Sequence, residues 1–331
     1  MNNSLLGYTA FKVGKLLVIM ILVSVISFTL VSLSPLDPIT AYLGVDRMQI
    51  SQEQQALIIN RWGLDQPPVD RFFIWAGRIF QGDFGRSMIF NQPVISVIGQ
   101  RFMASLWLMG AAWVLSGVLG FVLGIIAGAW KNSLADRVIR LYAFTLASTP
   151  TFWMGLVLLV AFAVKLDWAP FCCAGPPGVL PQDITLGQRL HHLILPAATL
   201  SIIGTAAITM HTREKMIDVM NSDHALFARA QGESTLGLAL SHGVRNVSLP
   251  ALTLQFATIG ELFGGSVLAE QVFSYPGLGQ AVVQAGTRGD VPLLLGIVLF
   301  STLFVCCGNA LADLLYRAVD PRIRLGEGCH A

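Results

Sequence analysis

Long apolar stretches alternate with short polar segments along the whole chain, and their length sets the class of protein. A helix needs about 20 mostly apolar residues to cross the hydrocarbon core of a membrane. Six stretches reach or approach that length, at residues 16–33, 104–129, 141–164, 193–210, 249–268 and 291–315. The pattern therefore predicts an all-α integral membrane protein with six transmembrane helices.

Two of the predicted spans contain residues that weaken helices. The fourth contains Pro196 and Gly204, and the fifth contains Gly260, Gly264 and Gly265. Neighbouring helices in a bundle can satisfy the backbone groups that such residues leave free. We therefore expect both stretches to remain spans. The first stretch follows Lys12 and Lys15 and is too long for a cleavable signal, so we expect a retained first span.

Composition agrees with lipid as the solvent of this chain. Of its 331 residues, 54% are hydrophobic and 12% are charged, with a mean hydropathy of +0.66. Soluble domains carry about 25% charged residues. A net charge of +2 without a basic run argues against nucleic acid as a partner. The cysteines, Cys172, Cys173, Cys306, Cys307 and Cys329, lack the spacing of a zinc site or a disulfide scaffold.

Basic residues gather in the short loops on one side of the predicted spans. That side carries Lys12, Lys15, Lys131, Arg137, Arg140, Arg213, Lys215, Arg229, Arg245, Arg317, Arg322 and Arg324, whereas the opposite short loops carry only Lys165, Arg189 and Arg288. Cytoplasmic loops hold the excess of Lys and Arg. Both termini are therefore expected in the cytoplasm of a multi-pass protein.

This topology divides the chain into four parts. Residues 1–34 form the cytoplasmic N-terminus and first span, and residues 35–101 form a long external loop. Residues 102–318 form a five-span core, with a polar insert near 222–245, and residues 319–331 form a cytoplasmic tail. Within the external loop, residues 69–81 have the pattern of an amphipathic helix. Such a helix would lie on the membrane, cap the bundle or bind a soluble partner.

The polar insert lies between the fourth and fifth predicted spans. Ser222 and Asp223 are good N-caps, residues 225–231 favour a helix, and Gly232 should stop it before a second short helix. The small residues Ala225, Ala228 and Ala230 would let the helix enter a groove of another protein. The alternative is an ordinary solvated loop.

Short motifs in this insert carry a resemblance to a known family. The segment Ala228-Arg229-Ala230-x-Gly232, followed by His242, Arg245-Asn246 and Pro250, resembles the coupling loop of ABC importer permeases of the nickel/peptide branch. Other matching motifs follow in order: Phe28 with Leu33-x-Pro35-x-Asp37-Pro38, Leu64-Asp65-Gln66-Pro67, Gly82-Asp83-Phe84-Gly85-x-Ser87, Thr149-Pro150-x-Phe152-Trp153-x-Gly155, Glu270-x-x-Phe273-x-x-Pro276-Gly277-Leu278-Gly279 and Asp320-Pro321-Arg322-Ile323-Arg324.

The insert also departs from the family pattern. His224 and Ala225 stand where the first glutamate of the loop is usual, and Glu233, Leu236 and Gly237 stand where many relatives carry basic residues. Met210 replaces an arginine that is common after the fourth span. These departures affect the details of how the loop would contact an ATPase subunit, and not the role that the resemblance implies for it.

The resemblance implies a type I ABC importer permease fold in a bacterial inner membrane. It implies pairing with a second homologous permease, two cytoplasmic ATPase subunits on the coupling loops, and an extracytoplasmic solute-binding protein. The residues implied in coupling are Asp223, Ala228, Arg229, Ala230, Gly232 and Arg245. The chain has no GxxxxGK[ST] phosphate loop, so we expect no enzyme activity, no cofactor and no metal in it, with ATP and Mg bound by the partner ATPases.

One acidic residue falls deep within a predicted span. Glu261 lies 12 residues after Leu249, or about 18 Å at the helical rise of about 1.5 Å per residue, near mid-membrane. Intramembrane carboxylates are costly and face the bundle interior or water. Gly260-x-x-x-Gly264 permits close helix packing, and Gly265, four residues after Glu261, leaves room on the same face. Glu261 therefore either lines a translocation pathway or fixes helix packing by a hydrogen bond.

A turn motif follows the fifth predicted span. Glu270, Phe273, Pro276, Gly277 and Gly279 would form an outer gate or a contact for the binding protein, or else only an interfacial turn. Metal binding by Cys172-Cys173 with His191-His192 is disfavoured, because adjacent ligands fit one tetrahedral site poorly.

The cargo is the least constrained feature. Residues 260–265 and the tail Glu327-Gly328-x-His330-Ala331 resemble nickel-type members, so a transition metal, carried as a chelate, is the first expectation. The alternative is a di- or oligopeptide. An intramembrane enzyme is disfavoured because the sequence has no HExxH, no GxSxG and no acid paired with Glu261. The cytoplasmic insert argues against a stand-alone secondary transporter.

Overall fold

A computed structural model describes residues 2–33, 51–62, 65–179 and 183–319. Across these residues the regular structure is helical, apart from one isolated bridge between Arg86 and Pro93. The chain forms two compact units, one made of Met1–Ala104 and Gly277–Cys307 and the other of Ser105–Pro276 and Gly308–Ala331. The helices α5 (Val94–Ala129) and α14 (Val291–Val319) contribute to both units.

The predicted all-α membrane fold is confirmed. The helices α1 (Asn2–Ser32), α5, α8 (Leu186–Met220) and α14 each contain a stretch long and apolar enough to cross a membrane. Two further candidate spans are bent pairs of helices. One joins α6 (Leu134–Ala147) to α7 (Thr151–Leu158) and its π-helical continuation η2 (Leu159–Lys165), and the other joins α11 (Val244–Ala257) to α12 (Ile259–Val272). The described chain thus has four to six spans.

The third and fifth predicted spans are not continuous helices, which corrects the sequence prediction. The third bends by 110° between Ala147 and Thr151, and the fifth bends by 53° at Thr258. Pro150 cannot donate a backbone hydrogen bond and drives the preceding residue out of the helical region. Pro196 and Pro250, by contrast, lie inside α8 and α11. The fourth predicted span also continues to Met220 instead of ending at residue 210.

In the first unit, α4 (Pro68–Phe80) packs against the end of α1. Its Trp75 joins Phe28 of α1 and Leu295 of α14 in a buried apolar cluster. The guanidinium of Arg71 donates to Ser32 Oγ at 3.0 Å and lies 5.7 Å from the centroid of the Phe28 ring. The amphipathic helix predicted over residues 69–81 is therefore present, and its buried face packs within the unit, as a capping helix would.

In the same unit, the Gly-Asp-Phe-Gly-x-Ser motif of the outer loop is hydrogen-bonded to the start of α14. Gly82 and Gly85 adopt positive φ angles of 81° and 79°, which suit glycine. Ser87 Oγ donates to Asp290 Oδ2 at 2.6 Å, and Asp290 Oδ1 accepts from the Leu293 backbone N–H at 3.2 Å. One carboxylate thus binds the loop and also caps the first turn of α14.

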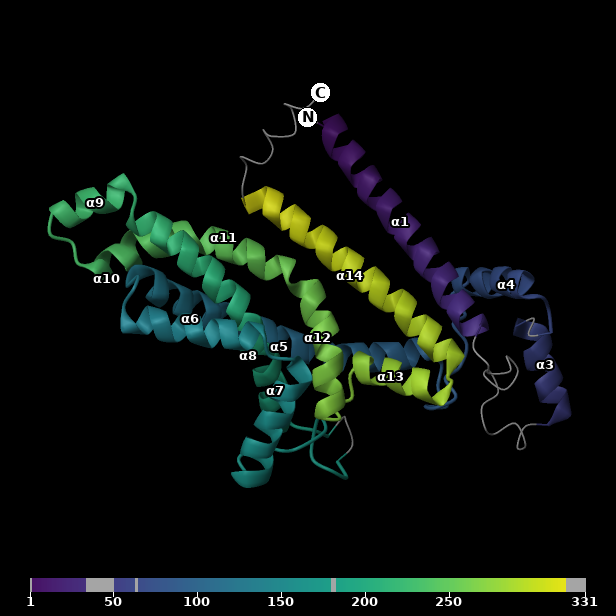
Figure 1. Cartoon of the computed structure of the whole chain (residues 1–331). Helices are drawn as coiled ribbons and strands as arrows, with labels where there is room; N and C mark the ends of the chain where they lie inside the picture. The colour runs from purple at the N-terminus through teal and green to yellow at the C-terminus, as the bar shows by residue number, and fades with distance from the viewer. Residues whose placement is uncertain (1, 34–50, 63–64, 180–182, 320–331) are drawn as a thin grey trace. The chain divides into compact units, whose positions relative to one another are not determined.

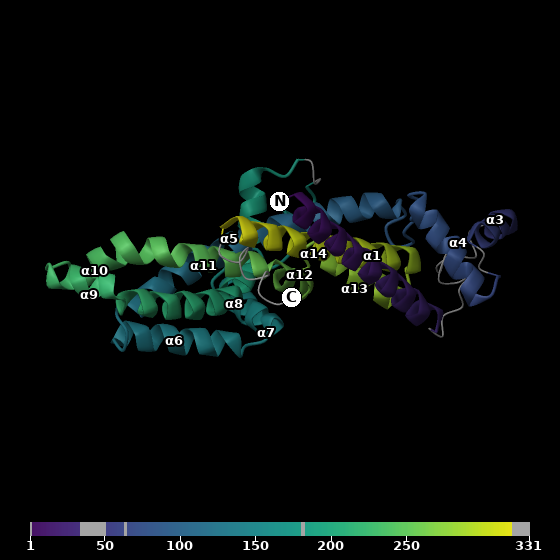
Figure 2. The same cartoon turned by 90° about the horizontal axis from the view of Figure 1, so that it is seen from above.

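In the second unit, α6, α8 and α11 run side by side in both views (Figures 1 and 2). Asp136 of α6 is fully buried and accepts from the Nε and Nη2 of Arg213 on α8 at 2.6 and 2.9 Å. The backbone N–H of Asn132 donates to the same carboxylate at 2.9 Å. This bidentate pair joins α6 to α8.

Close packing of α5 on α8 was missed by the sequence analysis. Gly120, Gly124 and Gly128 recur every four residues and face Ile208, Thr212 and Met216 of α8, which have the same spacing. A Cβ atom built at Gly124 would lie 2.5 Å from the Cβ of Thr212 and 2.8 Å from the carbonyl oxygen of Thr209. The small-xxx-small spacing, typical of close contacts between membrane helices, was the available signal.

Candidate functional site: the helical insert and the cavity at the broken spans

The polar insert folds as predicted into a short helix, a glycine turn and a second helical segment. α9 (Asp223–Ala230) is followed by α10 (Thr235–Leu238), which continues through the π-helical η3 (Ala239–Gly243) into α11. Ser222 caps α9, since its Oγ accepts from the Ala225 backbone N–H at 3.4 Å. The insert lies at one end of the α8 and α11 pair (Figure 1).

Gly232 ends α9, as the sequence predicts. Its φ is +89°, its N–H donates to the Arg229 carbonyl at 3.0 Å, and the Glu233 N–H donates to the Ala228 carbonyl at 3.1 Å. These two hydrogen bonds define a Schellman motif, in which the left-handed residue after the helix is usually glycine.

We expect Gly232→Val to lower ATP-driven uptake, measured relative to the amount of protein in the membrane. A Cβ at this position would meet open space, so the effect comes from the backbone, where a left-handed L-residue costs about 1–2 kcal/mol. Gly232→Asn is the matched control, because asparagine tolerates this conformation and should stay near wild type. Equal uptake by the valine and wild-type proteins would show that the end of α9 has no role in transport.

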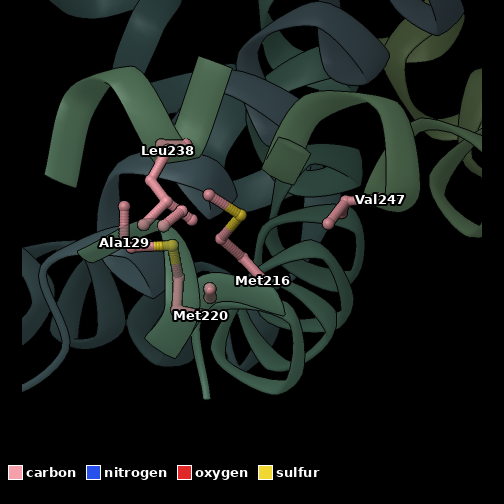
Figure 3. Packing of buried hydrophobic residues seen from close by; sticks show 8 residues of the cluster. Ala129, Met216, Met220, Leu238 and Val247 are labelled. Carbon is pink, nitrogen blue, oxygen red and sulfur yellow. The ribbon is translucent and has the colours of Figure 1, made fainter. Parts of the chain in front are cut away.

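The inner face of α9 packs against its own chain. Ala225 and Ala228 are buried in one apolar cluster with residues of α5, α8, α10, η3 and α11 (Figure 3). The cluster consists of Ala129, Met216, Met220, Ala225, Ala228, Leu238, Ala239 and Val247. The small side chains of Ala225 and Ala228 therefore seat α9 on α8 and do not enter a partner's groove, which corrects that expectation. Ala230 is exposed.

Four large apolar side chains of the insert are exposed, and the sequence analysis missed them. Phe227 exposes 66% of its surface, and Leu226, Leu236 and Leu240 expose more than half of theirs. Asp223, Arg229 and Arg245 are exposed as well. We call Leu226, Phe227, Leu236 and Leu240 the outer face. In α9 the signal was the placement of Leu226 and Phe227 between the buried Ala225 and Ala228, because one helix turn then presents an inner and an outer apolar side.

The two breaks in the spans border the same cavity, which has a volume of about 150 Å³. Thr151 follows the first break and Thr258 lies at the second. The wall comprises Ser116, Thr151, Leu200, Ile203, Gly204, Ala207, Thr258, Glu261, Leu262 and Gly265. Glu261 and Gly265 therefore border one cavity, whereas Gly264 lies on the exposed side of α12, where an added Cβ would meet nothing within 4 Å.

The turn after α12 is more buried than a contact surface for a soluble protein. Glu270 is 0% exposed and accepts from Ser105 Oγ at 2.6 Å, and Phe273 is 1% exposed. Burial, followed by the negative charge of Glu270, raises the pKa of Tyr275 to about 12. Pro276 is half-buried, while Gly277 and Gly279, at the start of α13 (Leu278–Arg288) in the other unit, are buried.

The cysteine prediction needs a correction. Cys172 and Cys173 form a disulfide, whereas the spacing of the cysteines in the sequence predicted no disulfide scaffold. The Cys173 N–H donates to the Phe273 carbonyl at 3.0 Å, and His192 Nδ1 lies 2.9 Å from the Cys172 carbonyl oxygen. Among the described residues, no three His, Cys, Asp or Glu side chains are placed to hold a metal ion.

Some of the motifs behind the family resemblance lie outside the described residues. They are Pro35, Asp37 and Pro38 after the first span, Leu64 in the outer loop, and residues 320–324 and 327–331 of the tail, which include Cys329. The described motifs are those of the outer loop from Asp65 onward, the broken third span, the insert and the turn after α12.

Comparison with known proteins covers nearly the whole chain. Residues 120–325 match the family described as binding-protein-dependent transport system inner membrane component. The chain is 34% identical to the oligopeptide transport system permease protein AppB of Bacillus subtilis over 302 residues, or 91% of this chain and 94% of that protein. It is 35% identical to the glutathione transport system permease protein GsiC of Escherichia coli K12 over 322 residues, or 97% and 99%.

A solved structure shows the same fold. The inward-facing MetNI methionine ABC transporter superposes with a TM-score of 0.54 at 14% identity, covering 68% of this chain and 97% of that one. The type I ABC importer permease fold implied by the sequence is therefore present.

Proposed function

Since this chain belongs to the family of binding-protein-dependent transport system inner membrane components, we propose that the ABC importer of which it is a permease subunit carries di- or oligopeptides. The observation behind this proposal is the end-to-end similarity to oligopeptide and glutathione permeases. The relatives are permease subunits and not enzymes. Their names favour the peptide alternative over nickel or a metal chelate, which rests only on residues 260–265 and the tail.

Coupling to ATP hydrolysis is assigned to the insert. The family uses ATPase and binding-protein partners, and we propose that an ATPase subunit covers the outer face formed by Leu226, Phe227, Leu236 and Leu240. Exposed apolar patches mark protein interfaces, and this short insert carries four large exposed apolar side chains. Asp223, Arg229, Ala230 and Arg245 would form its polar rim, while Ala228 and Gly232 set the position of α9. ATP and Mg would then bind only to the partner subunits.

The transport pathway is assigned to α12 and the turn after it. Glu261, Gly264 and Gly265 would line the path together with a second homologous permease. The turn carrying Glu270, Phe273, Pro276, Gly277 and Gly279 would serve as an outer gate, since the burial of Glu270 and Phe273 favours a gate over a docking surface. The basic loops favour cytoplasmic termini for this multi-pass inner-membrane protein.

Uptake by cells lacking this permease tests the cargo. Complementation with the chain and its native partners should restore uptake of radiolabelled trialanine and leave uptake of labelled nickel unchanged, with or without added histidine as a chelator. Restored nickel uptake without peptide uptake would instead establish the metal alternative.

A further inference from the structure

The cavity at the two broken spans has the chemistry of a site for a single positive charge. Among the described residues that form its wall, Glu261 is the only ionisable one, and none is Lys, Arg or His. Its other polar side chains are the hydroxyls of Ser116, Thr151 and Thr258, which can accept hydrogen bonds from a cation. Leucine, isoleucine, alanine and glycine residues form the rest.

Glu261 is placed to meet a ligand. Its side chain is exposed, and within the described chain it has no hydrogen-bond or ion-pair partner. On α12 it shares the exposed side with Gly264 and Leu268, while Leu262, Ser266 and Ala269 are buried against the unit. A carboxylate at membrane depth is costly in contact with lipid, so this side should face water or a second subunit.

The breaks give the cavity a second feature of transport sites. Discontinuous membrane helices are tolerated where the interrupted backbone is buried in protein or lines a water-filled space, and transporters place substrate sites at such interruptions. Here two breaks, one at Pro150 and one at Thr258, border one cavity. A cation at this point would meet one carboxylate and up to three hydroxyl groups.

We propose that Glu261 binds the primary ammonium group of a peptide during its passage, with Thr151 and Thr258 as the neighbouring acceptors. This inference rests on the proposed peptide function. A transition metal or Ca²⁺ requires several protein ligands, whereas an ammonium group is satisfied by one carboxylate and two hydroxyls. A volume of about 150 Å³ is too small for a whole oligopeptide and fits one end of it.

The first test compares uptake of two peptides by the complete reconstituted complex. Glu261→Gln should lower uptake of trialanine by about tenfold, equivalent to about 1.4 kcal/mol, and leave uptake of N-acetyl-trialanine unchanged. For each peptide, the uptake rate of the variant complex is divided by that of the wild-type complex. Both complexes use the same binding protein, so its preference for one peptide over the other cancels in this ratio. Asp183→Asn, a change at an exposed carboxylate outside the cavity wall, is the control and should alter neither ratio.

A second readout does not depend on transport. A water-soluble carbodiimide should join labelled trialanine to Glu261 through an amide bond, located by mass spectrometry, and neither Glu261→Gln nor N-acetyl-trialanine should give that product. N-acetyl-Ala-Ala-Lys tests whether a side-chain ammonium serves equally. Equal losses for both peptides, or a product unchanged by Glu261→Gln, would overturn the ammonium site. Absence of uptake of any peptide by the wild-type complex would instead overturn the proposed function.

Discussion

Replacing Phe227 with alanine should reduce ATP-driven uptake by about tenfold or more while the chain stays in the membrane at its normal level. A few residues near the centre of an interface carry most of its binding energy, about 2 kcal/mol or more each, and we expect Phe227 to be one of them. Phe227 exposes 66% of its surface, so its removal creates no cavity in the chain itself. Uptake of labelled peptide, divided by the amount of permease in the membrane, is the measurement.

Leu186→Ala provides the matched control for this variant. Leu186 exposes a similar 63% of its surface but begins α8, at the opposite end of that helix from the insert. We expect uptake close to wild type. If Phe227→Ala and Leu186→Ala behave alike, the outer face of the insert has no special role.

Gly124→Ala should strongly lower the amount of folded permease in the membrane, because there is no space between α5 and α8 for the added methyl group. The added Cβ would lie 2.5 Å from the Cβ of Thr212 and 2.8 Å from the Thr209 carbonyl oxygen, and neither atom can move without the helix backbone. Overpacking of this kind costs about 1–3 kcal/mol and sometimes more. Thermal unfolding in detergent and abundance in the membrane should both fall.

Gly110→Ala tests whether this effect is specific to the contact. Gly110 lies on the same helix, and a Cβ there would have no heavy atom within 4 Å. Alanine is a better helix former than glycine, so this variant should be as stable as wild type or slightly more so. Similar losses at both positions would mean that the α5 and α8 packing is not as close as described.

The spans could be predicted from the sequence because membrane thickness imposes their length. The two breaks could not, because proline and glycine occur in both continuous and broken helices here. Pro196 and Pro250 lie within helices, whereas Pro150 marks a sharp bend. A helix stays continuous or breaks according to whether neighbouring helices form hydrogen bonds with the backbone groups that proline or glycine leaves free. That depends on the tertiary structure and cannot be read from the local sequence.

The insert shows the same division between local and tertiary information. Capping by Ser222 and termination at Gly232 depend on adjacent residues, and both were predicted. The burial of Ala225 and Ala228 depends on Met216 and Met220 of α8, which the sequence does not place beside them. The predicted groove contact of these alanines was therefore wrong, and the outer face with Phe227 was missed.

The cavity around Glu261 combines both kinds of information. The position of Glu261 inside a predicted span followed from the sequence, but its neighbours in the cavity wall, Ser116, Thr151 and Leu200, come from three other helices. The disulfide between Cys172 and Cys173 is a further case, because no spacing rule for paired frameworks applies to adjacent cysteines. Only the folded loop, held by the Phe273 carbonyl and His192, shows how the pair is placed.

Photocrosslinking from position 227 tests the central claim most directly. Benzoylphenylalanine in place of Phe227 preserves the aromatic ring and, in the assembled importer, should form a covalent adduct with an ATPase subunit on illumination. The same group at position 186 should form none. An importer that transports peptide but gives no ATPase adduct from position 227 would contradict the assignment of the insert as the site where ATP hydrolysis is coupled to transport.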